Sequence, residues 1–257
     1  TATTQRPTAA GETDDSAGQP TPGEHRPGRF IVLEGIDGAG TTSQTERLLV
    51  WLASHGLRVH RTAEPSGGPI GRLIRSLLSA SATPLEPRAM ALLFAADRRD
   101  HLQREIEPLL AQGVIVLCDR YVLSSLAYQT VAGVPHAAVT QANADIRRPD
   151  LTLFFSLPVS VAAQRRVERA SEVEIYDADS VQQRVAAAYE REAHALQAAG
   201  ESIVFIDASR ETASSSSWGE ACEGSTATGG VMALRGGHSG EIVCVWRISQ
   251  RVVRLRS

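Results

Sequence analysis

The sequence predicts an α/β fold in which a parallel sheet of five strands carries helices on both faces. Short apolar and β-branched runs, typical of strands buried inside a parallel sheet, recur along the chain. Stretches in which apolar residues follow helical spacing separate these runs. Strands that alternate with helices form parallel sheets, because each helix returns the chain to the edge where the previous strand began. A glycine-rich turn between the first strand and the first helix supports the same prediction.

The elements follow in chain order. The first strand is expected over residues 29–34, and the first helix contains residues 43–52, where leucines recur at helical spacing. His55-Gly56 stops this helix, because glycine readily adopts the left-handed backbone found at helix ends. The remaining elements expected are a strand at 57–62, a helix at 70–78 opened by Pro69, a helix from 87 to about 112, strands at 114–118, 151–155 and 202–206, and a helix at 160–169.

The composition favours a cytoplasmic protein without nucleic-acid or membrane partners. The 257 residues include 26 basic and 29 acidic side chains, so no large net charge attracts a polyanion or a membrane surface. No apolar run approaches the roughly 20 residues that span a membrane, and no signal peptide is recognisable. The three cysteines lack the spacing of a metal site or a disulfide framework.

The chain divides into three expected segments. Residues 1–28 have almost no bulky apolar side chains and are expected to form a disordered leader, because they bury too little surface to offset the entropy of ordering. Residues 29–211 form the predicted domain. Residues 212–257 form a tail that the alternating pattern does not place. Within it, residues 243–247 are compatible with an added edge strand, and an extension read from a shifted frame is a second interpretation.

The turn after the first strand predicts a phosphate-binding P-loop, and hence a sheet of the P-loop NTPase type. It fits the pattern G-x-x-x-x-G-K-[ST] except at Thr41, where the lysine belongs. Glycines let the backbone N–H groups point inward, and the helix N-terminus adds positive potential, so the turn cradles an anion. A purely structural turn is the alternative. The residues expected to hold the nucleotide are Gly35, Ile36, Asp37, Gly38, Ala39, Gly40, Thr41 and Thr42.

The missing lysine has a consequence for the whole chain, because the sequence contains no lysine at all. All 26 basic residues are arginines. A cation on a bound phosphate must therefore be an arginine or a metal ion. Ligands of parallel sheets bind beyond the C-terminal ends of the strands, which is where the loop, Glu64 and Asp119-Arg120 all fall.

From about residue 29 to residue 207 the chain resembles the thymidylate kinases, within the P-loop nucleoside-monophosphate kinase group. The block at 119–129 is the most diagnostic, because it separates thymidylate kinases from adenylate- and guanylate-type relatives. The matching motifs, in order, are LEGIDGAG at 33–40, T-x-E-P with GGPIG at 62–71, LFAADR at 93–98, DRYVLSSLAYQ at 119–129 and PDLTL at 149–153.

The resemblance implies a magnesium-dependent transfer of the ATP γ-phosphoryl group to dTMP, giving dTDP and ADP. Positioning and charge neutralisation supply most of the catalysis in such a reaction. ATP and Mg²⁺ are the implied cofactors, and a homodimer is the implied assembly. Two alternatives stay open: a weakened nucleotide-binding module of the same fold, and a kinase for another pyrimidine monophosphate.

The resemblance also implies roles for single residues. Thr42 and Asp119 would hold the magnesium shell. Arg98 and Arg120 would grip the acceptor phosphate, and Asp37 would orient the acceptor nucleotide. Arg120 and Asp37 are therefore expected to be catalytic residues. Phe94 would stack on thymine, while Arg75 and Gln129 read its polar edge and Tyr128 excludes a ribose 2′-hydroxyl. The alternatives are a solvated Arg98, a Phe94 that only packs in the core, and a structural Asp119–Arg120 pair. The expected substrate residues are Glu64, Arg75, Phe94, Arg98, Arg120, Ser124, Tyr128 and Gln129.

The departures from the family pattern concern charge. Besides Thr41, Ala63 replaces an arginine, the lid reads Val173-Glu174 where an Asp-Arg pair is common, and no closing helix is recognisable. Arg165 and Arg169 lie four residues apart on the expected helix at 160–169, and Arg166 flanks them. Closure of this lid would bring a guanidinium to the γ-phosphoryl group in place of the lysine. A solvated helix face is the alternative.

Overall fold

The computed structural model describes residues 28–79, 82–168, 178–209, 234–236 and 240–242. The expected leader therefore lies almost entirely outside the described residues, and so do Arg169, the lid residues 173–174 and most of the expected tail. Two short strands in the tail, β6 (Leu234–Gly236) and β7 (Gly240–Ile242), form an antiparallel pair separate from the main sheet.

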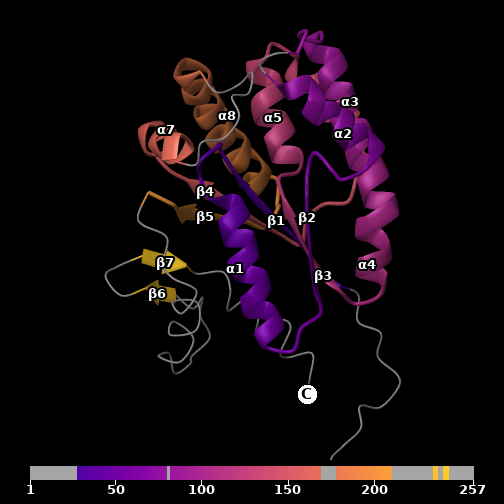
Figure 1. The fold of residues 1–257 in the computed structure, drawn as a ribbon, viewed down its shortest axis with the longest axis vertical. Coiled ribbons are helices and arrows are strands. Elements are labelled where there is room, and N and C mark those ends of the chain that lie inside the picture. The colour runs from indigo at the N-terminus through magenta and orange to yellow at the C-terminus, as the bar shows by residue number, and fades with distance from the viewer. Residues whose placement is uncertain (1–27, 80–81, 169–177, 210–233, 237–239, 243–257) are drawn as a thin grey trace, which may run out of the picture.

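The main sheet has five strands, all parallel, in the order β2-β3-β1-β4-β5 (Figure 1). This confirms the predicted fold class. The central strand β1 is buried along its whole length, whereas the edge strand β2 is half-buried, as expected for a sheet covered on both faces. The strands are β1 (Phe30–Gly35), β2 (Val59–Ala63), β3 (Ile115–Asp119), β4 (Leu151–Ser156) and β5 (Ile203–Asp207).

Helices connect the strands and cover the sheet. Successive side chains of β1 point to opposite faces of the sheet. Ile31 and Leu33 therefore join the hydrophobic cluster that includes helix α1. Phe30 and Val32 pack on the other face, with the π-helical segment η1 (Leu102–Ile106). The helix expected from 87 to about 112 is present as α3, η1 and α4 in succession. The helices are α1 (Thr41–Ser54), α2 (Pro69–Leu78), α3 (Pro87–His101), α4 (Glu107–Ala111), α5 (Val122–Val131), α6 (His136–Ala142), α7 (Val159–Glu168) and α8 (Asp179–Ala198).

The C-terminal ends of the central strands meet at one edge of the sheet. Leu33 of β1 lies level with Asp119 at the end of β3, and Ala63 of β2 lies level with the same residue. The turns that follow these strands therefore converge. In the part of the chain that the structure describes, no helix is both long and apolar enough to cross a membrane.

Candidate active site

The P-loop connects β1 to α1 and has the backbone that its glycines allow. Gly38 and Gly40 have φ angles of 93° and 88°, in the left-handed region that other residues enter only at a cost. Gly40 is the N-cap of α1, so the first helical amides open toward the loop. A Cβ atom on Gly38 would lie 2.4 Å from the carbonyl oxygen of Ala162 in α7. Helix α7 therefore packs directly on the loop.

Thr42 and Asp119 meet at the end of the loop. The Thr42 hydroxyl, in the first turn of α1, donates a hydrogen bond of 2.6 Å to Oδ2 of Asp119 at the end of β3. The other carboxylate oxygen, Oδ1, is buried and has no hydrogen-bond partner among the described residues. A hydroxyl beside a carboxylate with one unused oxygen is a donor set that suits Mg²⁺, which completes its shell with water and substrate phosphates.

A cavity of about 190 Å³ lies next to the P-loop, beyond β1 and β3. Its lining comes from the β2–α2 turn and helices α2, α3 and α5, which are far apart in the sequence. All eight residues expected to bind substrate line this one cavity: Glu64, Arg75, Phe94, Arg98, Arg120, Ser124, Tyr128 and Gln129. Asp37 of the P-loop lines it too.

Arg98 is one of the most buried side chains of the protein, with 1% of its surface exposed. Its Nε donates to Oε2 of Glu64 at 2.8 Å, and Nη2 donates to the Tyr121 carbonyl at 2.9 Å and to the Ser125 hydroxyl at 3.1 Å. Nη1 donates to the side chain of Asn143. The alternative of a solvated Arg98 is therefore wrong. Its guanidinium is held rigidly in the cavity wall.

Arg120 joins the P-loop to the acceptor cavity. Its φ of 72° lies in the left-handed region, a strained backbone for a residue with a side chain. Nη2 donates to Oδ1 of Asp37 at 2.6 Å, and Nη1 donates to the Gly35 carbonyl at 3.1 Å and to the Tyr189 hydroxyl at 3.0 Å. Burial alone would raise the pKa of Asp37, but Arg120 and the Tyr128 hydroxyl hold that pKa below its ordinary value. Asp37 is therefore ionised at neutral pH.

The residues expected to read the base differ in whether their polar atoms already form hydrogen bonds within the protein. Gln129 is 1% exposed, and its Oε1 has no hydrogen-bond partner among the described residues. Tyr128 donates its hydroxyl to Oδ2 of Asp37 at 2.6 Å. Arg75 donates to the Ser66 carbonyl at 2.7 Å. Phe94 is half-buried, one helical turn before Arg98.

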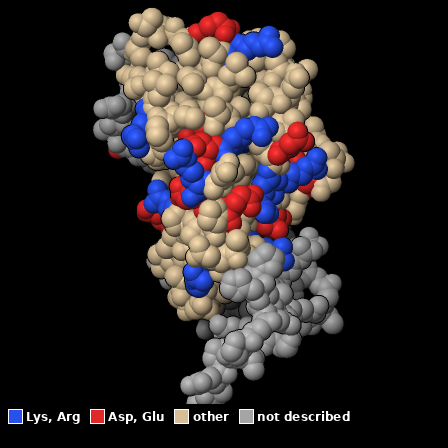
Figure 2. Space-filling model, turned by 90° about the vertical axis from the view of Figure 1, so that its right-hand side faces the viewer, with Lys and Arg blue, Asp and Glu red and all other residues tan. Residues whose placement is uncertain are grey.

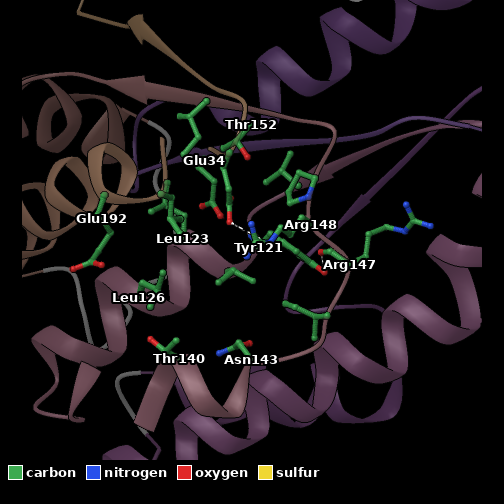
Figure 3. A pocket seen from close by; sticks show the side chains of 18 of the residues that line it. Glu34, Tyr121, Leu123, Leu126, Thr140, Asn143, Arg147, Arg148, Thr152 and Glu192 are labelled. Carbon is green, nitrogen blue, oxygen red and sulfur yellow. Dashed lines mark hydrogen bonds and ion pairs between the residues drawn. The ribbon is translucent and has the colours of Figure 1, made fainter. Parts of the chain in front are cut away.

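Glu34 is a buried residue that the sequence reasoning did not single out. Its Oε1 accepts the backbone N–H group of Tyr121 at 2.8 Å (Figure 3). The same oxygen accepts the backbone N–H group of Ser124 at 3.2 Å. Its Oε2 accepts the hydroxyls of Ser124 at 2.6 Å and Tyr189 at 3.3 Å. Burial raises the pKa of Glu34, although these hydrogen bonds and the charge of Arg120 oppose the shift. The sequence does carry a signal for this role, because Glu34 is the acidic residue of an otherwise apolar strand.

Tyr121 also lines a second, larger cavity of about 350 Å³ (Figure 3). Leu123 and Leu126 of α5 form part of its apolar wall. Polar side chains around this cavity contact other residues of the chain: Nε2 of His136 lies at hydrogen-bond distance, 2.9 Å, from Oε2 of Glu192. Arg147 pairs with Glu107 at 2.6 Å. This cavity contains neither the P-loop nor the predicted reacting groups, so the smaller cavity is the candidate acceptor site.

The arginines expected in the lid point in different directions. Arg165 donates to the carbonyl of Ala208, just beyond β5, at 3.0 Å. Arg166 instead donates to the carbonyl of Asp37 in the P-loop at 3.0 Å. Arg169 lies outside the described residues. Arg166, which is expected only to flank Arg165 and Arg169, thus forms a hydrogen bond with the P-loop.

Comparison with known proteins adds a family to this geometry. The thymidylate kinase family model matches residues 33–217 of this chain. The chain is 40% identical over 181 residues to a probable thymidylate kinase of Pyrobaculum aerophilum, covering 70% of this chain and 88% of the relative. It is 42% identical over 195 residues to a thymidylate kinase of Chromobacterium violaceum, covering 73% of this chain and 89% of the relative. The chain belongs to the thymidylate kinase family.

Proposed function

We propose that this chain transfers the γ-phosphoryl group of ATP to dTMP, giving dTDP and ADP. The observation that carries the proposal is the convergence of all eight expected substrate residues on one cavity beside the P-loop. Membership of the thymidylate kinase family supports the same acceptor.

Recognition of thymine rests on a buried acceptor. Oε1 of Gln129 has no partner among the described residues, and thymine carries an N3–H group that can donate to it. A base without that N–H leaves the oxygen unpaired, which costs about 1–3 kcal/mol. Phe94 offers a flat apolar surface on which the ring stacks. Uracil has the same N–H, so discrimination against UMP falls to Tyr128, where it limits space for a ribose 2′-hydroxyl.

Two arginines position the phosphate of the acceptor. Arg98 and Arg120 both line the cavity, and their guanidinium planes match phosphate oxygens. Each is balanced by one carboxylate, Glu64 for Arg98 and Asp37 for Arg120. These carboxylates hold the guanidinium groups in place before the substrate arrives, which reduces the entropy lost on binding.

The P-loop holds ATP through its backbone amides, and Thr42 with Asp119 would hold Mg²⁺ beside the phosphates. When bound, the metal neutralises charge on the phosphate oxygens. An oxygen of the dTMP phosphate forms a bond to the γ-phosphorus, and the bond from that phosphorus to the bridging oxygen of ADP breaks, its electron pair leaving with ADP. The chain contributes alignment of the two phosphates and compensation of their charge.

A homodimer is the assembly we infer for this kinase. Leu73 of α2 and Leu92 of α3 are 48% and 56% exposed, so each of these two helices presents a large apolar side chain to solvent. The upper part of the face in Figure 2, on the side of α2 and α3, has few charged side chains. A second copy of the chain would cover this surface. The cytoplasmic location, and the absence of nucleic-acid and membrane partners, stay predictions.

An acceptor panel tests the proposal. ADP release from ATP is followed with dTMP, UMP, dCMP and AMP in turn, at the same concentration. We expect dTMP to be the best acceptor, with UMP and AMP far behind. Equal rates with AMP would contradict the thymine site. ATP binding without turnover on any acceptor would favour the weakened module, and a preference for dCMP or UMP would favour a kinase for another pyrimidine.

A further inference from the structure

His101, the last residue of α3, is a buried histidine that the proposed reaction does not use. Its side chain is 1% exposed, and polar groups of three residues surround the ring. Nε2 lies 2.7 Å from the Thr62 hydroxyl and 3.6 Å from Oε2 of Glu105. Nδ1 lies 3.3 Å from Oε1 of Glu64. Both ring nitrogens are therefore paired within the protein, and one of them faces the carboxylate that binds Arg98.

Glu64 divides its two carboxylate oxygens between Arg98 and His101. Oε2 accepts Nε of Arg98 at 2.8 Å and lies 2.7 Å from Nη2 of the same guanidinium. Oε1 faces Nδ1 of His101 instead. Arg98 and His101 are three residues apart in α3, so they are neighbours on one side of the helix. The carboxylate thus bridges one helical turn, and it cannot rotate without breaking one of the two contacts.

The chemistry of its partners determines which nitrogen of His101 carries a proton. An ionised carboxylate only accepts hydrogen bonds, so the nitrogen that faces Glu64 has to be an N–H group. A hydroxyl both donates and accepts, so Thr62 can serve Nε2 whether or not that nitrogen is protonated. Nδ1 therefore donates to Glu64, and the contact with Thr62 fixes the plane of the ring.

The orientation of Arg98 depends strongly on Glu64. The other groups that accept from this guanidinium are neutral: a backbone carbonyl, a hydroxyl and a side-chain amide. Hydrogen bonds between charged groups are roughly twice as strong as neutral ones, so Glu64 makes the strongest of these contacts. A rotation of the Glu64 carboxylate would consequently move a guanidinium that lines the acceptor cavity.

We propose that His101 is a positioning residue for the acceptor phosphate: through Glu64, it fixes the guanidinium of Arg98 in the orientation that binds the phosphate of dTMP. This inference rests on the proposed function, in which Arg98 contacts that phosphate. His101 is not among the residues that line the acceptor cavity, so its effect on the substrate passes through Glu64. The thymidine part of the substrate should not sense it.

Two substitutions separate the two ring nitrogens of His101. Asparagine can place its amide N–H₂ where Nδ1 lies and so keeps the donor to Glu64, whereas glutamine reaches the position of Nε2 and keeps the contact with Thr62. Calorimetry compares binding of dTMP with binding of thymidine, which lacks the phosphate. His101→Gln should weaken dTMP binding about tenfold and thymidine binding less than about twofold. His101→Asn should keep the ratio of the two affinities within about threefold of the parent value.

Steady-state kinetics provide a second readout. His101→Gln should raise the KM for dTMP about tenfold and leave the KM for ATP within about twofold of the parent value, because Glu64 lies on the acceptor side. His60→Ala is the matched control. This histidine belongs to the same cluster, with Nε2 2.8 Å from Oε1 of Glu105, but it does not contact Glu64 in the structure. It should change neither KM, and an effect as large as that of His101→Gln would contradict the proposed route.

The affinities also show what would overturn the proposal. Equal losses of dTMP and thymidine affinity in His101→Gln would reveal a merely structural role, and equal behaviour of the two His101 variants would exclude a role for Nδ1. If neither variant folds, the parent chain still decides, because ¹⁵N shifts of His101 in the dTMP complex should show a proton on Nδ1, and a bare Nδ1 would refute the proposal. If the parent chain phosphorylates no acceptor, the proposed function fails, while the affinity ratio still tests His101.

Discussion

Glu34 offers the sharpest test of how the fold supports the site. Its carboxylate accepts four hydrogen bonds, from two backbone N–H groups and from the hydroxyls of Ser124 and Tyr189. Glu34→Ala removes the acceptor of all four groups, although the Tyr189 hydroxyl can still donate to the Ser124 hydroxyl at 2.6 Å. Each buried unsatisfied donor costs about 1–3 kcal/mol, and water entering the vacated space recovers part of the loss. We therefore expect a loss of about 4 kcal/mol in the free energy of unfolding.

Glu34→Gln is the matched control, because it preserves size and one carbonyl oxygen. That oxygen still accepts both backbone N–H groups, and the two hydroxyls rotate to accept from the new amide. Thermal unfolding should show a loss of roughly 10 °C for Glu34→Ala, at about 2–4 °C per kcal/mol for a chain of this size. Glu34→Gln should unfold within about 3 °C of the parent chain. Equal losses in the two variants would refute this account.

The pH dependence of Glu34→Gln adds a check on sign. Burial raises the pKa of Glu34 above its ordinary 4.5, so the folded state holds its proton at a pH where the unfolded state has released it. The contribution of Glu34 to the stability of the parent chain is therefore fully present at low pH and is lost as the pH rises from about 4.5 through the raised pKa. The glutamine does not titrate. As the pH rises across this window, the melting temperature of Glu34→Gln should therefore increase relative to that of the parent chain. A difference that stays constant with pH would contradict the burial argument.

Three further predictions concern the metal, the assembly and the segments outside the described domain. Asp119→Asn removes the charge beside Thr42, so the MgCl₂ concentration that gives half-maximal activity should rise at least about tenfold. An unchanged midpoint would argue against a metal site there. Leu92→Arg replaces the exposed leucine of α3 with a charged side chain, and light scattering should report a monomer where the parent chain is a dimer. Residues 29–211 alone should retain the kcat of the full chain, whereas an insoluble product would show that the tail belongs to the fold.

Much of this protein was accessible from its sequence, because the relevant signals are local. The strand before the loop, the glycines at 38 and 40 and the helix after them occupy consecutive positions, and backbone preferences act over such distances. The five strands followed from apolar runs of strand length, and the structure confirms them. The set of acceptor residues was expected from the family resemblance, and these residues line one cavity in the structure.

Only the tertiary structure decided which partner each polar side chain takes. Arg98 reads as an ordinary helix arginine, yet it is buried, because Glu64 and Asn143 arrive from distant parts of the chain to satisfy it. Arg165 and Arg166 are adjacent, and the 100° turn of a helix per residue sends one to β5 and the other to the P-loop. The rotation of α7 about its axis is set by its packing against Gly38. Spacing along the chain does not encode that rotation, because it depends on contacts made only after folding.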